Sequence, residues 1–416
     1  MAITYNSVDE KEFCKKLLDL KPPWFVRNVI MNEGEHILDI FVDHPKGIKF
    51  PCPECGIESI VYDHQRERIW RDKDSVDFET YLHAKPPRIR CQKHGIMLAN
   101  IPWSEKSSRF TTRFETHAID VLKATDVTNA SKILSITWDE AWHIMDKAVR
   151  RGLARKTSSP EIIGIDEKSY GKHHNYVTII YNLIKPGVEY VSFGRKRSSI
   201  NGYYTTMDKE NRKKIRSVSM DMWKPYIMST KRYVKDADSK IVFDRFHISK
   251  HMNQALDDVR KHENTILRKS GDGTLVGTKY VWLYTEKNLP KKYRKIFNEL
   301  KNSDLKTARA YSIKENLRNL WNCTTVEEAK EFWKRWYFWA THSRLDPIIK
   351  KAKMIRDHLS GVMAYFTHRI TNAVAEGMNS KIATIQKMAY GYRNKEHFKT
   401  AIYFHCGNLQ LYPEIH

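Results

Sequence analysis

The sequence has few of the features that mark secreted, disulfide-rich or membrane proteins. It contains 6 cysteines in 416 residues, too sparse and too unevenly spaced for a disulfide framework, which indicates a reducing compartment. No stretch approaches the roughly 18 apolar residues of a membrane-spanning helix. The first residues contain no apolar signal core. We therefore expect a cytoplasmic protein.

Negative charge is scarce relative to positive charge. The chain has 72 lysines and arginines against 49 aspartates and glutamates, a formal net charge of +23. Such an excess favours nucleic acid as a partner, although an anionic membrane surface would also attract it. The length and the 41% of hydrophobic residues are sufficient for several packed domains.

Two short segments have the spacing of zinc knuckles. Each ends in a glycine, Gly56 in the first and Gly95 in the second. Together they offer three sulfurs and one nitrogen, a tetrahedral set for one structural Zn²⁺: Cys52, Cys55, Cys91 and His94. The long interval between the knuckles is typical of β-hairpins, so we predict a zinc ribbon; unliganded buried thiols are the alternative. Weaker ligand candidates are Cys14, His64 and His83.

The ribbon is also basic, and Trp70 and Tyr81 alternate with its arginines. This pattern suits contacts to DNA phosphates, although a solvated basic face would show the same composition. We predict that the ribbon contacts DNA through Arg66, Arg68 and Arg71.

Residues 106–156 predict three helices, at 112–125, 127–134 and 138–151. Thr137 and Glu140 form a capping box at the start of the third. A short helix, a tight turn and a longer helix predict a helix-turn-helix, with three-helix packing without DNA as the alternative. The exposed face of the third helix begins with acidic residues. We therefore expect DNA contacts from its basic end: Lys147, Arg150, Arg151, Arg155 and Lys156.

A second fold begins after residue 160. Its predicted strands lie at 162–165, 176–181, 188–193, 214–220 and 240–243, with helices at 198–209 and from 222 onward. The predicted order is three strands, a helix, a strand, a helix and a last strand. A ribonuclease-H-like core has this order, with a meander before two parallel strands.

Carboxylates stand at the ends of three of these strands: Asp166, Asp221 and Asp244. In such a core, Asp166 and Asp221 would be neighbours on adjacent strands, where they would suit a metal-dependent nuclease site. For any one of them alone, a turn aspartate is the alternative. Asp244 is a rival ligand because it also ends a strand.

Residues 245–370 show helical patterns and no strand pattern. A last long helix begins near residue 371 and carries Glu376 and Asn379 on one face. Gly377 inside this helix costs about 1 kcal/mol relative to alanine. We therefore expect the helix to approach a strand or DNA closely at this position.

Six motifs, in order, make the chain resemble bacterial DDE-type insertion-sequence transposases of the ISL-three group. The resemblance covers nearly all of residues 50–407, although His94 stands where many relatives have cysteine. The motifs are CPECG with Cys91 and His94, RERIWRD, GIDEKSYGKHHNYVTII, SVSMDMWKPY, IVFDRFHI and TNAVAEGMNSKIATIQKMAYGYRN.

The resemblance implies a multidomain α+β protein with catalytic residues Asp166, Asp221 and Glu376. We expect an N-terminal segment with a zinc ribbon, a helix-turn-helix, a ribonuclease-H-like catalytic core, an all-helical insertion and a closing part of the core with a C-terminal helix. The expected bounds are 1–105, 106–156, 157–244, 245–370 and 371–416.

The implied reaction is Mg²⁺-dependent cleavage and strand transfer at the terminal inverted repeats of an insertion sequence. Two Mg²⁺ ions about 3.5–4 Å apart stabilise the attacking and the leaving oxygen, and Mn²⁺ is a substitute. Asp166 would bridge both ions, while Asp221 and Glu376 would each hold one.

The expected partners are the double-stranded DNA of the repeats and of the target, bound by a homodimer in the bacterial cytoplasm at the nucleoid. The alternatives are a ribonuclease-H-like nuclease without strand transfer and a DNA-binding regulator.

Overall fold

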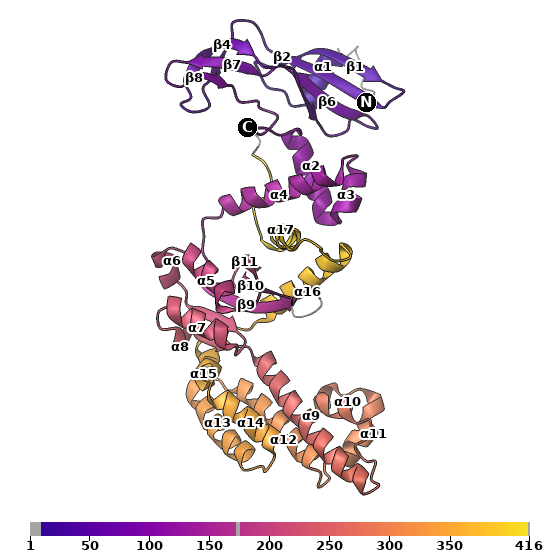
Figure 1. Cartoon of the computed structure of the whole chain (residues 1–416), viewed down its shortest axis with the longest axis vertical. Helices are drawn as coiled ribbons and strands as arrows, with labels where there is room; N and C mark the ends of the chain where they lie inside the picture. The colour runs from indigo at the N-terminus through magenta and orange to yellow at the C-terminus, as the bar shows by residue number, and fades with distance from the viewer. Residues whose placement is uncertain (1–9, 172–174, 415–416) are drawn as a thin grey trace, which may run out of the picture. The chain divides into compact units, whose positions relative to one another are not determined.

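The computed structural model describes residues 10–171 and 175–414. Residues 172–174, which belong to the motif GIDEKSYGKHHNYVTII, lie outside the described residues. The chain divides into two compact units, and most of their elements are labelled in Figure 1. One comprises Met1–Lys156, Met388–His405 and Leu409–His416, and the other Thr157–Lys387 and Cys406–Asn408. Among the described helices, none combines the length and the apolar character needed to span a bilayer.

The described residues of the first unit form two four-stranded sheets, preceded by the short helix α1 (Glu10–Leu17). One sheet has the order β1-β2-β6-β5, built from β1 (Phe25–Asn32), β2 (Ile37–Asp43), β5 (Arg68–Arg71) and β6 (Glu79–Ala84). The other has the order β3-β4-β7-β8, built from β3 (Lys49–Pro51), β4 (Glu58–His64), β7 (Pro87–Cys91) and β8 (Gly95–Leu98).

These strands enclose one apolar core around Trp70, Ile40 and Ile89, each fully buried. The sequence also predicts strands at 25–30, 36–42, 67–71, 76–84 and 88–91, the last three in the interval between the zinc knuckles. The structure confirms them as β1, β2, β5, β6 and β7, although β6 begins only at Glu79. The alternation of polar and apolar residues in β4 did not lead to a strand prediction, and the short β3 and β8 also went unpredicted.

Three helices follow, as predicted: α2 (Thr112–Ala124), α3 (Val127–Ile133) and α4 (Trp138–Ala154). The predicted capping box is present, because the Thr137 hydroxyl accepts from the amide of Glu140 while the Glu140 carboxylate accepts from the amide of Thr137. Ser135 turns the chain between α3 and α4 with a φ of 51°. Residues 395–405 of α17 (Lys395–Cys406) belong to the same unit.

The second unit contains a five-stranded sheet of order β11-β10-β9-β12-β13. The strands β9 (Ile162–Ser169), β10 (Tyr176–Asn182) and β11 (Gly187–Phe193) form an antiparallel meander. The strands β12 (Ser217–Met220) and β13 (Ile241–Phe243) then join parallel to β9 and to each other. The order of strands and helices expected from the sequence is therefore present.

Helices connect the parallel strands on the face that holds Ile163 and Ile165. They are α5 (Arg197–Thr206), α6 (Lys209–Lys213), α7 (Lys224–Tyr233) and α8 (Ala237–Lys240). The helix predicted at 198–209 ends early because Asp208 caps a new helix, its carboxylate accepting from the amide of Asn211. For the same reason the fourth strand begins at Ser217 rather than at residue 214.

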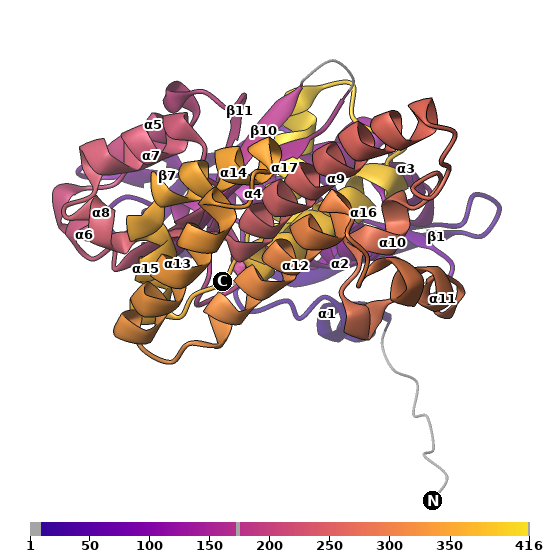
Figure 2. The same ribbon diagram turned by 90° about the horizontal axis from the view of Figure 1, so that it is seen from below.

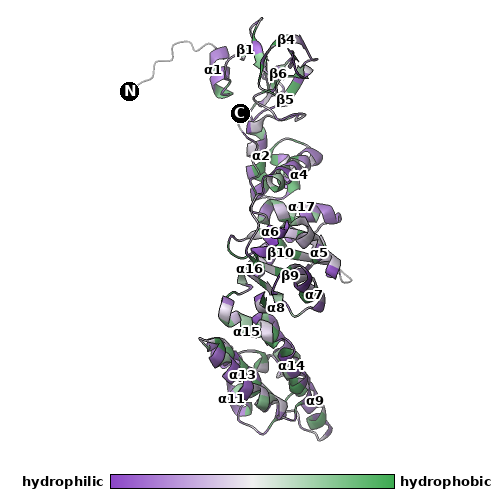
Figure 3. Cartoon of the chain, turned by 90° about the vertical axis from the view of Figure 1, so that its left-hand side faces the viewer, coloured by the Kyte–Doolittle hydropathy of each residue, from purple (hydrophilic) through white to green (hydrophobic). Residues whose placement is uncertain are grey.

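A helical region with its own core follows β13. It comprises α9 (Arg245–Lys269), α10 (Lys279–Leu283), α11 (Lys291–Leu300), α12 (Lys306–Leu317), α13 (Val326–Thr341), α14 (Asp346–Arg356) and α15 (Leu359–His368). Figure 2 shows α9 running beside α12 and α14. Figure 3 shows hydrophobic and hydrophilic residues mixed along these helices, as expected when each helix buries one face.

The chain returns to the sheet through α15, which contacts β13. Gly361 is required at this contact, because a Cβ there would collide with the ring of Phe243. The helix α16 (Ala373–Met388) follows.

Candidate functional site

The two predicted zinc knuckles meet in the first unit. Their four ligand atoms, from Cys52, Cys55, Cys91 and His94, all lie within 4.8 Å of one another. The Cys55 and Cys91 sulfurs are 3.7 Å apart, and His94 Nδ1 lies 3.6 Å from Cys52 Sγ and 3.8 Å from Cys91 Sγ. Tetrahedral Zn²⁺ with usual bond lengths requires about 3.8 Å between two sulfurs and about 3.6 Å between sulfur and nitrogen. The spacing therefore fits one zinc ion.

The backbone of each knuckle turns at its glycine, Gly56 with a φ of 72° and Gly95 with a φ of 70°. In the second knuckle, the amides of His94 and Lys93 point at the Cys91 sulfur and lower the pKa of this thiol to about 6. Amides in this position favour the thiolate, which is the form that binds zinc.

The weaker zinc candidates lie elsewhere. Cys14 is buried on α1 in the apolar core. His83 Nε2 is 2.7 Å from Asp39 Oδ1, and His64 Nε2 is 2.9 Å from His44 Nε2. None of the three belongs to the ligand group.

In the second unit, the sheet brings two predicted carboxylates to the same edge. β9 and β12 are parallel, with Ser219 opposite Gly164. Two residues further along, the register leads to Asp221, which directly follows β12, and to Asp166, which lies inside β9. The prediction that Asp166 ends its strand is therefore wrong, because β9 continues to Ser169 through pairing with β10. Glu167 faces the other way: its carboxylate lies 3.4 Å from Arg195 Nη1.

His247 connects these carboxylates, and the sequence analysis did not identify it. Its Nδ1 is 3.2 Å from Asp221 Oδ2, and its Nε2 is 3.9 Å from Asp244 Oδ2. Burial opposes the charge on His247, but the hydrogen bond and charge of Asp221, with Asp244 and Asp166, raise its pKa. At Asp221, burial would raise the pKa of the carboxyl, but the hydrogen bond and charge of His247 outweigh burial and lower it. The only sequence signal for His247 is its position three residues after Asp244, in the first turn of α9.

Asp244 has a structural role as well. Its carboxylate caps α9 by accepting from the amide of Phe246 at 3.0 Å. Its other oxygen, Oδ2, is buried and accepts no hydrogen bond from the described residues. An orphaned carboxylate oxygen that shares the neighbour His247 with Asp221 suits a hard cation such as Mg²⁺, which prefers oxygen ligands.

Asp166 is held from α16, by a residue more than two hundred positions later. Asn379 Nδ2 donates to Asp166 Oδ2 at 2.8 Å, and the Tyr181 hydroxyl donates to Asn379 Oδ1 at 2.8 Å. Lys168 Nζ also donates to the backbone carbonyl of Asn379 at 3.0 Å. Loss of hydration raises the pKa of Asp166 to about 6. These contacts dock α16 on the sheet beside Asp166.

Glu376, the third predicted carboxylate, lies one turn before Asn379 and is exposed. Across the part of the chain that the structure describes, the Cys/His group alone places three or more Cys, His, Asp or Glu ligand atoms at metal-binding spacing. The structure thus places Asp166 and Asp221 on neighbouring strands and brings the helix of Glu376 to Asp166, without gathering all three carboxylates at ligand distance.

Of the two alternatives expected at Gly377, close approach to a strand is wrong, whereas close approach to DNA stays a prediction. This glycine is exposed, and a Cβ there would meet no atom within 4 Å. The approach occurs instead at Gly164 on β9, where a Cβ would lie 3.0 Å from Asn372 Oδ1 and 2.9 Å from a Leu183 methyl.

Among the eight basic residues predicted to contact DNA, Arg71, Lys147 and Arg151 form ion pairs inside the first unit. Arg71 is only 5% exposed and forms ion pairs with Asp74 and Glu79. Lys147 and Arg151 both pair with Glu105 and with the buried Glu115, at 2.6–3.0 Å. Glu115 in particular needs cations, because burying an unpaired carboxylate is costly. Each of the three therefore has an intramolecular partner, and its contact with DNA stays a prediction.

The other predicted DNA contacts remain more accessible. Arg66 is exposed, and Arg150 is exposed apart from an ion pair with Asp146 at 2.8 Å. Arg68 is half-buried, stacks over Trp70 and donates to the carbonyl of Ser108 at 3.0 Å.

The first turn of α4, where a recognition helix usually reads bases, carries an aromatic group. The Trp138 and Trp142 rings stack 5.7 Å apart, and the His397 ring lies 4.0 Å from Trp142. This end of α4 is therefore partly covered by residues of α17 within the same unit.

Comparisons with known proteins match the chain in three consecutive parts. The zinc-finger of transposases IS204, IS1001, IS1096 and IS1165 matches residues 49–94. The helix-turn-helix domain of transposase family ISL3 matches residues 99–149, and the transposase domain of the same family matches residues 163–402.

Two curated relatives are similar over most of their length. The transposase for insertion sequence element IS1001 of Bordetella parapertussis is 24% identical over 353 residues, which cover 83% of this chain and 86% of the relative. The transposase for insertion sequence element IS1557 of Mycobacterium tuberculosis is 24% identical over 378 residues, which cover 83% of each chain.

Proposed function

This chain belongs to the ISL3 family of transposases, and we propose that it cuts DNA at the terminal inverted repeats of an insertion sequence and joins the ends to target DNA. The zinc ribbon and the helix-turn-helix supply the DNA-binding part. The sheet of the second unit supplies the catalytic part, in a ribonuclease-H-like arrangement. The strand order β11-β10-β9-β12-β13, a meander followed by two parallel strands, supports that assignment.

In this proposal, Asp166, Asp221 and Glu376 are the catalytic carboxylates. Mg²⁺, when bound, stabilises the attacking and the leaving oxygen of the phosphodiester. The chain contributes oxygen ligands that are fixed in advance: Asp166 by Asn379, and Asp221 by His247 and by the amide of Met222 at 2.6 Å. Preset ligands of this kind reduce the reorganisation that the reaction requires.

The observation that carries the proposal is the hydrogen bond between Asn379 and Asp166. Glu376 follows Asp221 only after the whole helical region, so the chain must return to the sheet for the three carboxylates to act together. The bond docks α16 at Asp166, and Glu376 lies one helical turn away on that helix. A side-chain rotation and a small shift of α16 would bring its carboxylate toward the sheet edge.

Asn379 and His247 are positioning residues in this scheme. Asn379 donates to Oδ2 of Asp166, while the other oxygen of this carboxylate, Oδ1, accepts from the amide of Glu167 at 2.8 Å. His247 neutralises part of the charge of three aspartates, which would otherwise repel one another at the sheet edge.

An insertion sequence has two terminal repeats, and each chain carries one such site. We therefore propose a homodimer in the DNA complex. Sizing the protein alone and with a terminal-repeat duplex tests this, and a complex with one chain per pair of ends would contradict it.

The reaction is tested with purified protein, a labelled terminal-repeat duplex, a target plasmid and Mg²⁺. We expect cleavage at the repeat end and transfer of that end into the plasmid. Cleavage without joined product would identify a nuclease without strand transfer. Binding without cleavage would identify a DNA-binding regulator.

A further inference from the structure

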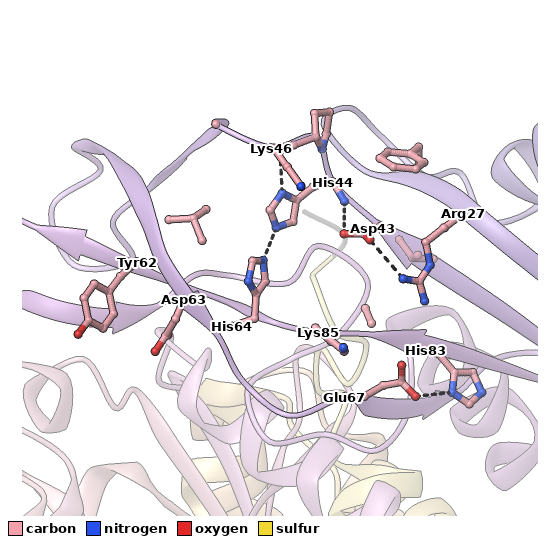
Figure 4. Close-up of a pocket in the computed structure, with 16 residues that line it drawn as sticks. Arg27, Asp43, His44, Lys46, Tyr62, Asp63, His64, Glu67, His83 and Lys85 are labelled. Atoms are coloured by element: carbon pink, nitrogen blue, oxygen red, sulfur yellow. Dashed lines mark hydrogen bonds and ion pairs between the residues drawn. The ribbon is translucent and has the colours of Figure 1, made fainter.

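A hollow of about 640 Å³ lies between the two sheets of the first unit, and no role has been assigned to it (Figure 4). β1, β2 and β6 line one side and β4 lines the other, with the loop after β2 between them. Its size is sufficient for a phosphate group with part of a nucleotide. The hollow is separate from the zinc ligands, none of which lines it.

Two histidines face one another across this hollow (Figure 4). His44 is 8% exposed and lies against the rings of Trp24 and Phe50, whereas His64 is exposed. Their Nε2 atoms are 2.9 Å apart. His44 Nδ1 is 3.0 Å from the carbonyl oxygen of Pro45.

These contacts fix the tautomers of both rings. A carbonyl oxygen only accepts, so His44 Nδ1 carries a hydrogen and its Nε2 is left as the acceptor. His64 Nε2 must then donate to it, which leaves a free lone pair on His64 Nδ1. The next proton to enter the pair goes to that atom and creates a cationic N–H donor on the exposed ring.

Two of the three acidic side chains that line the hollow are paired with arginines: Asp63 with Arg88, and Asp43 with Arg27 at 3.8 Å. The third, Glu67, lies 3.5 Å from His83 Nδ1, a contact that is an ion pair only when His83 is protonated. Lys46 and Lys85 also line the hollow, are exposed, and form no ion pair with any described residue.

We propose that this hollow binds a backbone phosphate of the DNA through Lys46, Lys85 and His64, and that binding adds one proton to the His44–His64 pair. The inference rests on the DNA-binding function proposed above and adds a contact that the sequence analysis did not include. Phosphate suits the site because two lysines and a new imidazolium N–H attract its negative charge and can donate to its acceptor oxygens.

The sign of the pH dependence follows from the pair. Burial, and then the neighbouring His44, lower the pKa of His64 in the free protein. A bound phosphate favours the protonated His64 ring. DNA affinity therefore rises as the pH falls toward the pKa of His64 in the free protein, by at most about tenfold per pH unit for one proton. The charged and titratable groups that line the hollow around the pair are Arg27, Asp43, Lys46, Tyr62, Asp63, Glu67, His83 and Lys85.

The test measures binding of a labelled terminal-repeat duplex to the full-length protein by fluorescence anisotropy, without Mg²⁺, between about pH 6 and about pH 8, the range in which histidine titrates. Wild type should bind about three- to tenfold more tightly at the lower pH. His64→Gln should lose most of this gain, since glutamine keeps a donor but takes up no proton. The matched control is His117→Gln, on α2 outside the hollow, which should keep it.

Lys46→Ala and Lys85→Ala should each reduce the slope of log affinity against log salt by about 1, as expected for one lost phosphate contact. Lys49→Ala, an exposed lysine outside the hollow, controls for net charge and should leave the pH gain unchanged. Unchanged salt slopes in both lysine variants, or a full pH gain in His64→Gln, would overturn the inference.

A last arm separates DNA phosphate from free phosphate. Inorganic phosphate at constant ionic strength should compete weakly with DNA in wild type and less in Lys46→Ala. Competition by phosphate with no effect of either lysine variant on DNA binding would contradict the DNA contact. Absence of any terminal-repeat binding by wild type would instead refute the proposed function itself.

Discussion

The zinc site and the carboxylate site differ in how the chain assembles them. In the zinc site, two knuckles of a few residues each bring four ligand atoms within 4.8 Å of one another. In the proposed carboxylate site, Asp166 and Asp221 depend on the register of two strands, and Glu376 would join them through a helix that returns after the whole helical region. The comparison teaches that short turns supply the ligands of the zinc site, whereas the proposed catalytic site would depend on tertiary contacts such as that between Asn379 and Asp166.

Loss of zinc should have the largest effect and should be confined to the first unit. Structural Zn²⁺ contributes on the order of 10–16 kcal/mol of apparent binding free energy, so chelation or Cys52→Ser should unfold the ribbon. Elemental analysis and hydrogen exchange measure the two effects.

Cys14→Ser is the matched control, because Cys14 is buried in the same core but is no zinc ligand. It should keep one zinc per chain. A metal-free protein with a protected ribbon, or full zinc in Cys52→Ser, would show that the ligand assignment is wrong.

Removal of a strand carboxylate should have the opposite pattern, with chemistry lost and structure kept. Asp166→Ala and Asp221→Ala should each reduce cleavage by roughly a thousandfold or more, the scale on which a member of a catalytic set acts. Zinc content and affinity for the terminal repeat should remain near wild type, because both aspartates lie in the second unit, whereas the zinc ligands and the proposed DNA-binding part lie in the first. Loss of DNA binding in parallel with cleavage would argue for a role in DNA contact instead.

The basic end of α4 allows a sharper comparison between two adjacent arginines. Arg151→Ala should destabilise the first unit by about 1–3 kcal/mol, since it removes one of the two cations of Glu105 and the buried Glu115 while Lys147 remains. Arg150→Ala should leave stability unchanged and weaken DNA binding modestly. Thermal unfolding and salt-dependent binding of both variants separate the two roles, and the reverse pattern would favour the DNA contact of Arg151.

Substitution of Asn379 should have a smaller effect than loss of zinc, of a strand carboxylate or of Arg151. Asn379→Ala removes the bond that orients Asp166, so the Mg²⁺ concentration needed for half-maximal cleavage should rise about ten- to hundredfold, as for other residues that orient metal ligands. High Mg²⁺ should rescue the rate. Ser380→Ala, an exposed neighbour on α16, should behave as wild type, and equal losses in both variants would point to a general disturbance of the helix.

The sequence was most informative where function depends on near neighbours. The spacing of Cys52 and Cys55, and of Cys91 and His94, was sufficient to predict the zinc ligands, and the alternation of strands and helices predicted the order of elements in the second unit. The roles of Lys147 and Arg151 could not be predicted, because their partner Glu115 lies more than thirty positions away. For the same reason the contact between Asn379 and Asp166 had no sequence signal beyond a shared helix face with Glu376.

The central claim is that Glu376 rather than Asp244 completes the carboxylate set, and a Mg²⁺-dependent cleavage assay on a labelled terminal-repeat duplex, run beside a binding assay, tests it most directly. Glu376→Ala should bind DNA and fail to cleave it. Asp244→Asn should retain measurable cleavage, because asparagine caps a helix as well as aspartate does and α9 would still hold His247. Normal cleavage by Glu376→Ala together with complete loss in Asp244→Asn would contradict the account and move the third ligand to the end of β13.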